Sequence, residues 1–299
     1  MAATRKNDRL FSSMLSSLAN VVLVDPHKRI VVYWFVLIPL SIVHDLIPLP
    51  ESYFSNKGNV LNQHFVKLSW AWTLLVTTVF IALTSYVYTL TNTSAVFKHL
   101  SRLLVGTGIW FVFTSIFDAV LHYTGSCTDP DYTDKRTCVK AGFTWNGFDI
   151  SGHAFLLSFC ALLITSELSV LKTWDRLQEA LEEKNKERGG SKKKRGTKSR
   201  NEILTQPQDD RETSLELYYR LTPIVSVLFG VLSALTFLWE FMLLTTAIYF
   251  HTISHKLVGL ACGTVSWYLT YGRWYKNAFP GLPGDGPLLK GLQRDRHIL

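Results

Sequence analysis

Residues 221–250 read LTPIVSVLFGVLSALTFLWEFMLLTTAIYF, a long apolar stretch with a single charged side chain, Glu240. A helix needs about 20 mainly apolar residues to cross the hydrocarbon core of a bilayer, so this stretch is long enough to span a membrane. A transmembrane β-barrel would show segments of about ten residues with alternating hydrophobicity, and the apolar stretches of this chain are continuous instead. The sequence therefore predicts membrane-spanning helices.

Five other apolar stretches have the same character, and together they predict six spans. The composition agrees, because 47% of the 299 residues are hydrophobic and only 18% are charged, which excludes a disordered chain. We therefore expect an all-α polytopic integral membrane protein whose membrane domain covers residues 30–275. The spans are predicted at residues 30–47, 64–90, 103–121, 147–171, 221–250 and 252–271.

The distribution of Lys and Arg predicts the orientation of these spans. With six spans, the N-terminal arm 1–29, the turn near Lys98, the loop 172–220 and the tail 276–299 all lie on one side. That side holds all but six of the 31 basic residues, so the positive-inside rule places it in the cytosol. The exceptions are Lys57, Lys67, Lys135, Arg136, Lys140 and Lys256.

Two cytosolic segments have an unusual composition. Leu10–Val24 is apolar but interrupted by four serines and Asn20, which favours an interfacial helix over a seventh span. Lys184–Arg200 contains nine basic residues and one acidic residue. This run is either a solvated loop or a contact for anionic lipids. It contains no aromatic residue, so we do not expect it to bind nucleic acid.

The four cysteines fall into two groups. Cys127 and Cys138 lie in the polar segment after the third predicted span, on the non-cytosolic side. An oxidising compartment permits a disulfide there, and the sequence leaves both the bridged and the free form open. Cys160 and Cys262 lie inside spans and are expected to be packing residues.

The first candidate site is the stretch DISGH at 149–153, at the non-cytosolic start of the fourth span. A helix N-terminus offers free N–H groups and a partial positive charge, which suits a phosphate. Gly152 would let an anion approach the backbone, and Ser151 can donate a hydrogen bond. Asp149, four residues before His153, is expected on the same helical face, where it would favour the imidazolium. The alternative is that Asp149 and Ser151 only cap the helix.

The second candidate is His251, which follows the fifth span and so reaches the same membrane boundary as His153. Two imidazoles at one boundary can divide a phosphoryl transfer, because one can attack phosphorus while the other protonates the leaving oxygen. His251 and His255 also have the spacing of some zinc ligands, but no HExxH motif accompanies them. We therefore expect neither a metal nor another cofactor.

Short motifs spread over most of the chain give it a family resemblance. They are PLPESY at 48–53, NVLN at 59–62, FVK at 65–67, WAW at 70–72, LLVGT at 103–107, HYTGSC at 122–127, GFDISGH at 147–153, YFH at 249–251 and SWY at 266–268. Through these stretches the chain resembles the fat storage-inducing transmembrane family, endoplasmic-reticulum proteins linked to lipid-droplet formation.

This resemblance implies six spans with cytosolic termini and an activity. The activity is a fatty acyl-CoA diphosphatase, which cleaves the CoA pyrophosphate to acyl 4′-phosphopantetheine and adenosine 3′,5′-bisphosphate. It would support lipid-droplet formation and lipid homeostasis in the endoplasmic reticulum. The two essential histidines of the family map onto His153 and His251.

The family is in turn similar to the lipid phosphate phosphatases. That similarity implies a lipid-phosphatase-like helical bundle with a lumenal active site, in which His251 is the nucleophile and His153 the general acid. The chain departs from the phosphatase pattern at Thr245-Thr246, where Ser-Arg is expected, and at His255, where Asp is expected. The residue that clamps the phosphate is therefore not given by the resemblance.

Lys67 and Glu240 complete the set of candidate substrate-binding residues. Lys67, about one turn into the second span, is the main candidate for the clamp, ahead of Lys256; its alternative role is to snorkel to the interface. Glu240 lies eleven residues before His251, on the same helical face and about 16 Å away. At membrane depth it can line a cavity and meet the polar part of a lipid, or form an interhelical hydrogen bond.

Two functions from different classes are consistent with these features. The favoured one is the enzyme, with fatty acyl-CoA as substrate and membrane lipids around it. The alternative is a non-catalytic membrane protein that binds diacylglycerol or triacylglycerol and partitions neutral lipid into droplets.

Overall fold

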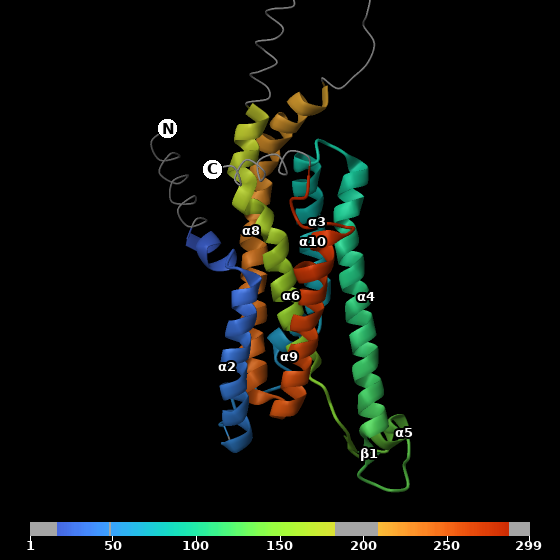
Figure 1. Ribbon diagram of the computed structural model, residues 1–299. Helices are drawn as coiled ribbons and strands as arrows, with labels where there is room; N and C mark the ends of the chain where they lie inside the picture. The colour runs from blue at the N-terminus through green and yellow to red at the C-terminus, as the bar shows by residue number, and fades with distance from the viewer. Residues whose placement is uncertain (1–16, 48, 183–208, 287–299) are drawn as a thin grey trace, which may run out of the picture.

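The fold is a bundle of long helices that lie side by side (Figure 1). The computed structural model describes residues 17–47, 49–182 and 209–286. Within these residues, strand is limited to one antiparallel pair of two residues each, so the all-α prediction is confirmed. The long helices are α2 (Pro26–Leu46), α3 (Ser69–Tyr88), α4 (Thr93–Thr124), α6 (Gly152–Leu168), α8 (Asp209–Tyr249) and α9 (Ile253–Trp267).

Short elements connect or extend the long helices. A π-helix precedes α3, a small disulfide-bonded hairpin with one helical turn joins α4 to α6, and irregular helices prolong α6 and α9. These elements are η1 (Leu61–Val66), β1 (Ser126–Cys127), α5 (Lys135–Lys140), β2 (Trp145–Asn146), η2 (Ser169–Thr173), η3 (Tyr268–Trp274) and α10 (Tyr275–Asn277).

Five helices in the described part of the chain are long and apolar enough to cross a membrane. They are α2, α3, α4, the helical path that α6 begins, and most of α8. Figure 1 shows that successive long helices run in alternating directions. The helix α9 has only 15 residues, although η3 and α10 continue its path. Five of the six predicted spans therefore coincide with helices that are long and apolar enough to cross a membrane, and the six-span topology stays a prediction.

Some helix ends differ from the predicted spans. The helix that contains the third predicted span, 103–121, starts earlier, at Thr93, because the Asn92 side chain caps it by accepting a hydrogen bond from the Ala95 N–H at 3.2 Å. The turn therefore comes before Lys98 and not around it. The fourth span starts at Gly152 instead of Gly147, since residues 147–151 are not helical.

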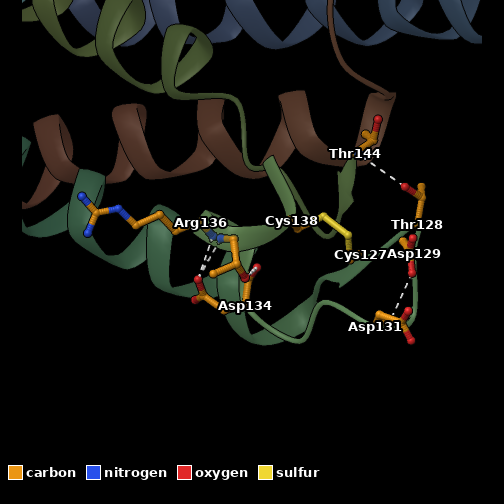
Figure 2. Close-up of a disulfide and its surroundings, with 9 residues drawn as sticks. Cys127, Thr128, Asp129, Asp131, Asp134, Arg136, Cys138 and Thr144 are labelled. Carbon is orange, nitrogen blue, oxygen red and sulfur yellow. Dashed lines mark hydrogen bonds between the residues drawn. A yellow bond between two sulfur atoms is a disulfide. The ribbon is translucent and has the colours of Figure 1, made fainter. Parts of the chain in front are cut away.

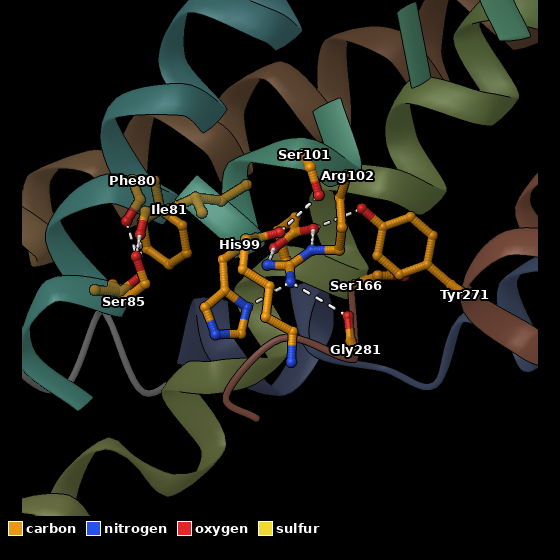
Figure 3. A network of polar contacts seen from close by, with 12 residues as sticks. Phe80, Ile81, Ser85, His99, Ser101, Arg102, Ser166, Tyr271 and Gly281 are labelled. Atoms are coloured by element: carbon orange, nitrogen blue, oxygen red, sulfur yellow. Dashed lines mark hydrogen bonds and ion pairs between the residues drawn. The ribbon is translucent and has the colours of Figure 1, made fainter. Parts of the chain in front are cut away.

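Arg102 of α4 is buried inside the bundle, where an ion pair compensates its charge. Arg102 and Glu167, each 1% exposed, meet through two hydrogen bonds of 2.7 and 2.8 Å (Figure 3). The Tyr271 hydroxyl donates to the same carboxylate at 2.5 Å. Breaking such a pair leaves an uncompensated buried charge and costs about 3–5 kcal/mol. This cluster therefore ties α4, α6 and η3 together at one end of the bundle.

The helix α6 lies at the centre of the bundle. In the most apolar 18-residue stretch of the helical path Gly152–Glu182, which α6 begins, 89% of the residues are buried, compared with 17% in the corresponding stretch of α4. A helix that is apolar on all sides fits an interior position, and α6 is covered by α3, α8 and α9. By contrast, α4 exposes large apolar side chains such as Leu104 and Phe111, as expected of a helix that faces lipid.

Two segments can be described only in part. Residues 17–22, from the predicted interfacial helix Leu10–Val24, are helical. They are separated from α2 by Asp25, whose carboxylate accepts a hydrogen bond from the His27 N–H at 2.8 Å and so caps α2. The basic run Lys184–Arg200 lies outside the described residues.

Two glycines let α9 approach α6 closely. A Cβ at Gly259 would lie 2.3 Å from the Ser151 carbonyl oxygen, and one at Gly263 would lie 2.3 Å from Ser158 Oγ and 2.5 Å from the Phe155 carbonyl oxygen. The spacing is the Gly-x-x-x-Gly pattern by which membrane helices pack at short range. The start of α9 is thereby held against the start of α6.

We expect Gly263→Ala to lower the stability of the protein by about 1–3 kcal/mol, because the new methyl group has no room against α6. Gly230→Ala is the matched control, since a Cβ at Gly230 in α8 meets nothing within 4 Å. That change should be neutral or slightly stabilising, as Ala is the better helix former. Thermal unfolding of both variants in detergent tests this, and equal melting temperatures would contradict it.

Candidate active site

The start of α6 and the turn between α8 and α9 form one site. The Ser151 N–H donates to the His255 carbonyl oxygen at 3.1 Å, which joins the two segments directly. The Asp45 carboxylate, from the end of α2, accepts a hydrogen bond from the Ile253 N–H at 2.9 Å and caps α9. Because of these contacts, His153 and His251 lie at the same end of the bundle, as the topology predicted.

His251 occupies a strained turn between α8 and α9. Its φ is +56°, a left-handed conformation that is uncommon for a residue other than glycine and that clusters at functional sites. Its side chain is 22% exposed, and Nδ1 lies 3.5 Å from Asp149 Oδ2. With Nδ1 directed at the carboxylate, Nε2 is the nitrogen left to act on a substrate.

The electrostatic environment of His251 has opposing parts. Burial lowers the pKa of His251, while the Asp149 carboxylate raises it by favouring the imidazolium. His255, Lys57 and Lys256 lower the pKa of His251 further, and the net direction is downward. The imidazole is therefore kept neutral, and so nucleophilic, at a lower pH than an exposed histidine would be.

The predicted role of Asp149 has to be corrected. Because α6 begins at Gly152, Asp149 lies outside the helix, and the shared helical face with His153 does not exist. The carboxylate contacts His251 instead. The carboxylate still acts electrostatically on His153 as predicted, but it does so from outside the helix, since the register argument assumed helix where the chain is not helical.

The first turn of α6 is arranged to receive an anion. The Ser151 hydroxyl accepts a hydrogen bond from the Ala154 N–H at 3.3 Å, so Ser151 is the helix cap, which was one of the two predicted roles. The N–H groups of Gly152 and His153 belong to the same turn, where the helix itself provides no partners. A Cβ added to Gly152 would meet nothing within 4 Å. The backbone at this helix end is therefore open to a ligand.

Two lysines lie within electrostatic range of His153, and only one of them was predicted. Lys67 ends η1 before α3 begins, so it stands at the entrance of the second span rather than one turn inside it. The second is Lys57, which also acts on His251. Gln63 connects the two lysines, because its side chain donates to the Lys57 carbonyl oxygen at 3.0 Å and accepts from Lys67 Nζ at 2.8 Å. No motif in the sequence marked Lys57, which belongs to an irregular loop.

Two further residues singled out by sequence are engaged elsewhere. Glu240 pairs with Arg29 and accepts a hydrogen bond from the Tyr33 hydroxyl at 2.7 Å. The structure therefore places it between α2 and α8 and not with the histidines. Lys256 is fully buried, and its ammonium donates to the Ala247 carbonyl oxygen at 2.9 Å.

A disulfide holds the loop that leads into the site. Cys127 and Cys138 are bonded in the hairpin between α4 and α6 (Figure 2), so of the two open forms the structure shows the bridged one. Beyond the hairpin, the Phe148 N–H donates to Thr124 Oγ1 at 2.8 Å. The Phe148 ring packs edge-on against His255 with centroids 4.5 Å apart. These contacts fix the chain before Asp149, and the bond from the Ser151 N–H to the His255 carbonyl oxygen fixes it after Asp149.

Comparison with known proteins finds one family and relatives that share one name. The profile of the fat storage-inducing transmembrane protein family matches residues 50–271. The chain is 41% identical over 266 residues to acyl-coenzyme A diphosphatase FITM2 of Mus musculus, covering 86% of each chain. It is 42% identical over 252 residues to that of Homo sapiens, covering 81% of each. The Drosophila melanogaster protein is 32% identical over 288 residues, which are 95% of this chain and 67% of that one. No solved structure matches the chain.

The Asp149 contact predicts a shift in the titration of His251. In Asp149→Asn the carboxylate that raises the pKa of His251 is gone, so His251 should titrate at a lower pH than in the wild type. Histidine NMR of the protein in detergent measures this directly. Asp118→Asn is the control, because Asp118 pairs with Lys135 instead. An unchanged or raised pKa in Asp149→Asn would contradict the assignment.

Proposed function

Since the chain belongs to the fat storage-inducing transmembrane protein family, we propose that it is a fatty acyl-CoA diphosphatase that works through His251 and His153. The names of its relatives supply the activity, and the arrangement of the site supplies the mechanism. The single observation that carries the mechanism is the contact of His251 with Asp149 beside the open N-terminus of α6.

The reaction begins with an attack on the CoA pyrophosphate. His251 Nε2 forms a bond to one anhydride phosphorus, and the bond from that phosphorus to the bridging oxygen breaks. His153 is the group placed to pass a proton to the departing oxygen, which leaves on the other phosphate group. The phosphorus is then bound covalently to His251, and the Asp149 carboxylate stabilises the positive charge on that ring.

Water completes the cycle. Neutral His153 accepts a proton from a water molecule, whose oxygen attacks phosphorus and releases His251. The products are acyl 4′-phosphopantetheine and adenosine 3′,5′-bisphosphate. During both steps the N–H groups of Gly152 and His153 and the ammonium groups of Lys57 and Lys67 would stabilise the phosphate oxygens.

The location and orientation of the enzyme are part of the same proposal, and the endoplasmic reticulum is the location that the family resemblance implies. We place the protein in the endoplasmic-reticulum membrane, with both termini in the cytosol and the histidines on the lumenal side. The concentration of basic residues on the opposite side supports this orientation, as does the Cys127–Cys138 disulfide, since disulfides persist in oxidising compartments. Removal of acyl-CoA at this membrane would support lipid-droplet formation and lipid homeostasis.

The decisive experiment compares three histidine variants of the purified protein. His251→Ala and His153→Ala should each lower the rate of acyl-CoA cleavage at least about a hundredfold, because each removes a group that takes part in bond breaking. His44→Ala is the matched control in α2 and should keep the rate. Product analysis follows both cleavage products, and full activity in His251→Ala would exclude this mechanism.

Covalent catalysis makes a separate prediction. Rapid quenching in alkaline denaturant during turnover should trap one phosphorus-bearing half of the substrate on wild-type His251 and leave none on His251→Ala, because the N–P bond of such an adduct is labile in acid. If no histidine adduct forms under rapid quench while cleavage continues, water attacks phosphorus directly.

Neutral-lipid binding is the second candidate function, and a cavity favours it. A space of about 400 Å³ lies between α2 and α8, lined mainly by valine and leucine, with Arg29, Tyr33 and Glu240 at its polar part. One nitrogen of Arg29, Nε, is buried without a hydrogen-bond partner, so a lipid ester or hydroxyl oxygen could satisfy it. Diacylglycerol and triacylglycerol have this combination of groups.

A bulky side chain in this cavity separates lipid binding from catalysis. Val36 lines the cavity, so Val36→Trp should weaken binding of labelled diacylglycerol about fivefold or more, which corresponds to about 1 kcal/mol. Val31→Trp, on the exposed side of α2, is the control. Acyl-CoA cleavage should be unchanged in both variants, and equal lipid binding by the two would count against this cavity.

A further inference from the structure

A second cavity lies at the end of the bundle opposite the histidines. It measures about 420 Å³ and is enclosed by the start of α2, the junction of α6 and η2, the π-helix η3 and the segment 282–284. A volume of this size fits a small ligand. Four parts of the chain that are distant in sequence therefore meet around one space, and the proposed reaction uses none of them.

The charges that line this cavity are mainly positive. Lys172, Arg176 and Lys276 contribute cationic side chains, and none of the three takes part in an ion pair with another described residue. The one carboxylate in the lining is Asp25, which already accepts a hydrogen bond from the His27 N–H. Three cations gathered without matching carboxylates favour an anionic ligand.

The wall of the cavity is apolar and fixed. The Trp267 indole N–H donates to Ser166 Oγ at 2.7 Å, and the His27 ring packs edge-on against Trp267 with centroids 5.1 Å apart. Leu282 and Pro283 contribute further apolar surface. Beside this wall runs η3, a π-helix, and π-helical turns occur frequently at functional sites. The cavity thus combines cations with a rigid apolar wall.

We infer that this cavity binds a phosphate-bearing ligand, with the phosphate held by Lys172, Arg176 and Lys276 and the remainder against Trp267. Arginine can bind phosphate through two parallel hydrogen bonds and lysine binds it as a point charge. The phosphate can come from the headgroup of an anionic phospholipid or from a soluble phosphate ester. The site is distinct from the histidine site, and its existence does not depend on the proposed reaction.

Calorimetric titration of the full-length protein in a neutral detergent tests this site. The protein carries His251→Ala in all samples, so that the ligand is not turned over. The probes are dioctanoyl phosphatidic acid, dioctanoylglycerol, which lacks the phosphate, and glycerol 3-phosphate, which lacks the chains. Binding of phosphatidic acid alone identifies a lipid headgroup as the source, and binding of glycerol 3-phosphate as well identifies a general phosphate site.

The matched variants are Lys172→Ser/Arg176→Ser and Arg220→Ser/Arg273→Ser. Both remove two exposed positive charges from the same end of the bundle, but only the first pair lines the cavity. We expect the first to weaken phosphatidic acid binding at least about tenfold and the second to leave it unchanged. Neither variant changes the site near His153, so any phosphate binding there is the same in both and does not affect the difference between them. Equal losses in the two variants, or equal binding of phosphatidic acid and dioctanoylglycerol, would overturn the inference.

Discussion

The close contact of α6 with α9 is the constraint on which the site depends. With hydrogen in place of a side chain at Gly259 and Gly263, the two helix backbones can approach to a distance that no larger residue permits. This approach allows the Ser151 N–H to bond to the His255 carbonyl oxygen. The α8–α9 turn is then held against the α6 N-terminus, so His251 stands beside a helix end that is open to an anion.

Both arginines that enter the bundle between helices are paired with a glutamate, because an unpaired charge away from water costs much free energy. Arg102 is paired with Glu167 and Arg29 with Glu240, and each pair joins two different helices. The contact of His251 with Asp149 has a different character, because it is partly exposed. The Asp149 carboxylate is the more exposed member of this contact, so a substrate can reach it, whereas the Arg102–Glu167 pair is fully buried and holds two helices together.

The two ends of the bundle have different chemistry. One end presents histidines, free N–H groups and two lysines beside a strained turn. The other has a rigid aromatic wall with three cations around a cavity. The first arrangement suits a phosphate that reacts and the second a phosphate that is only held. In the two proposals, the phosphate that reacts and the phosphate that is only bound are therefore held at opposite ends of the bundle.

The sequence alone determined the all-α membrane fold, five helices long and apolar enough to span a membrane, and the placement of His153 and His251 at one end, because each follows from the length and order of apolar stretches. It could not show that Asp149 faces His251, that Glu240 pairs with Arg29, or that Lys57 lies near both histidines. Hydrophobicity indicates where the chain can cross a bilayer, and the distribution of Lys and Arg indicates in which direction. The partner of a side chain depends on how each helix is rotated and where it starts. Only the tertiary packing decided these, at the α6 N-terminus for Asp149 and between α2 and α8 for Glu240, since side chains distant in sequence meet there.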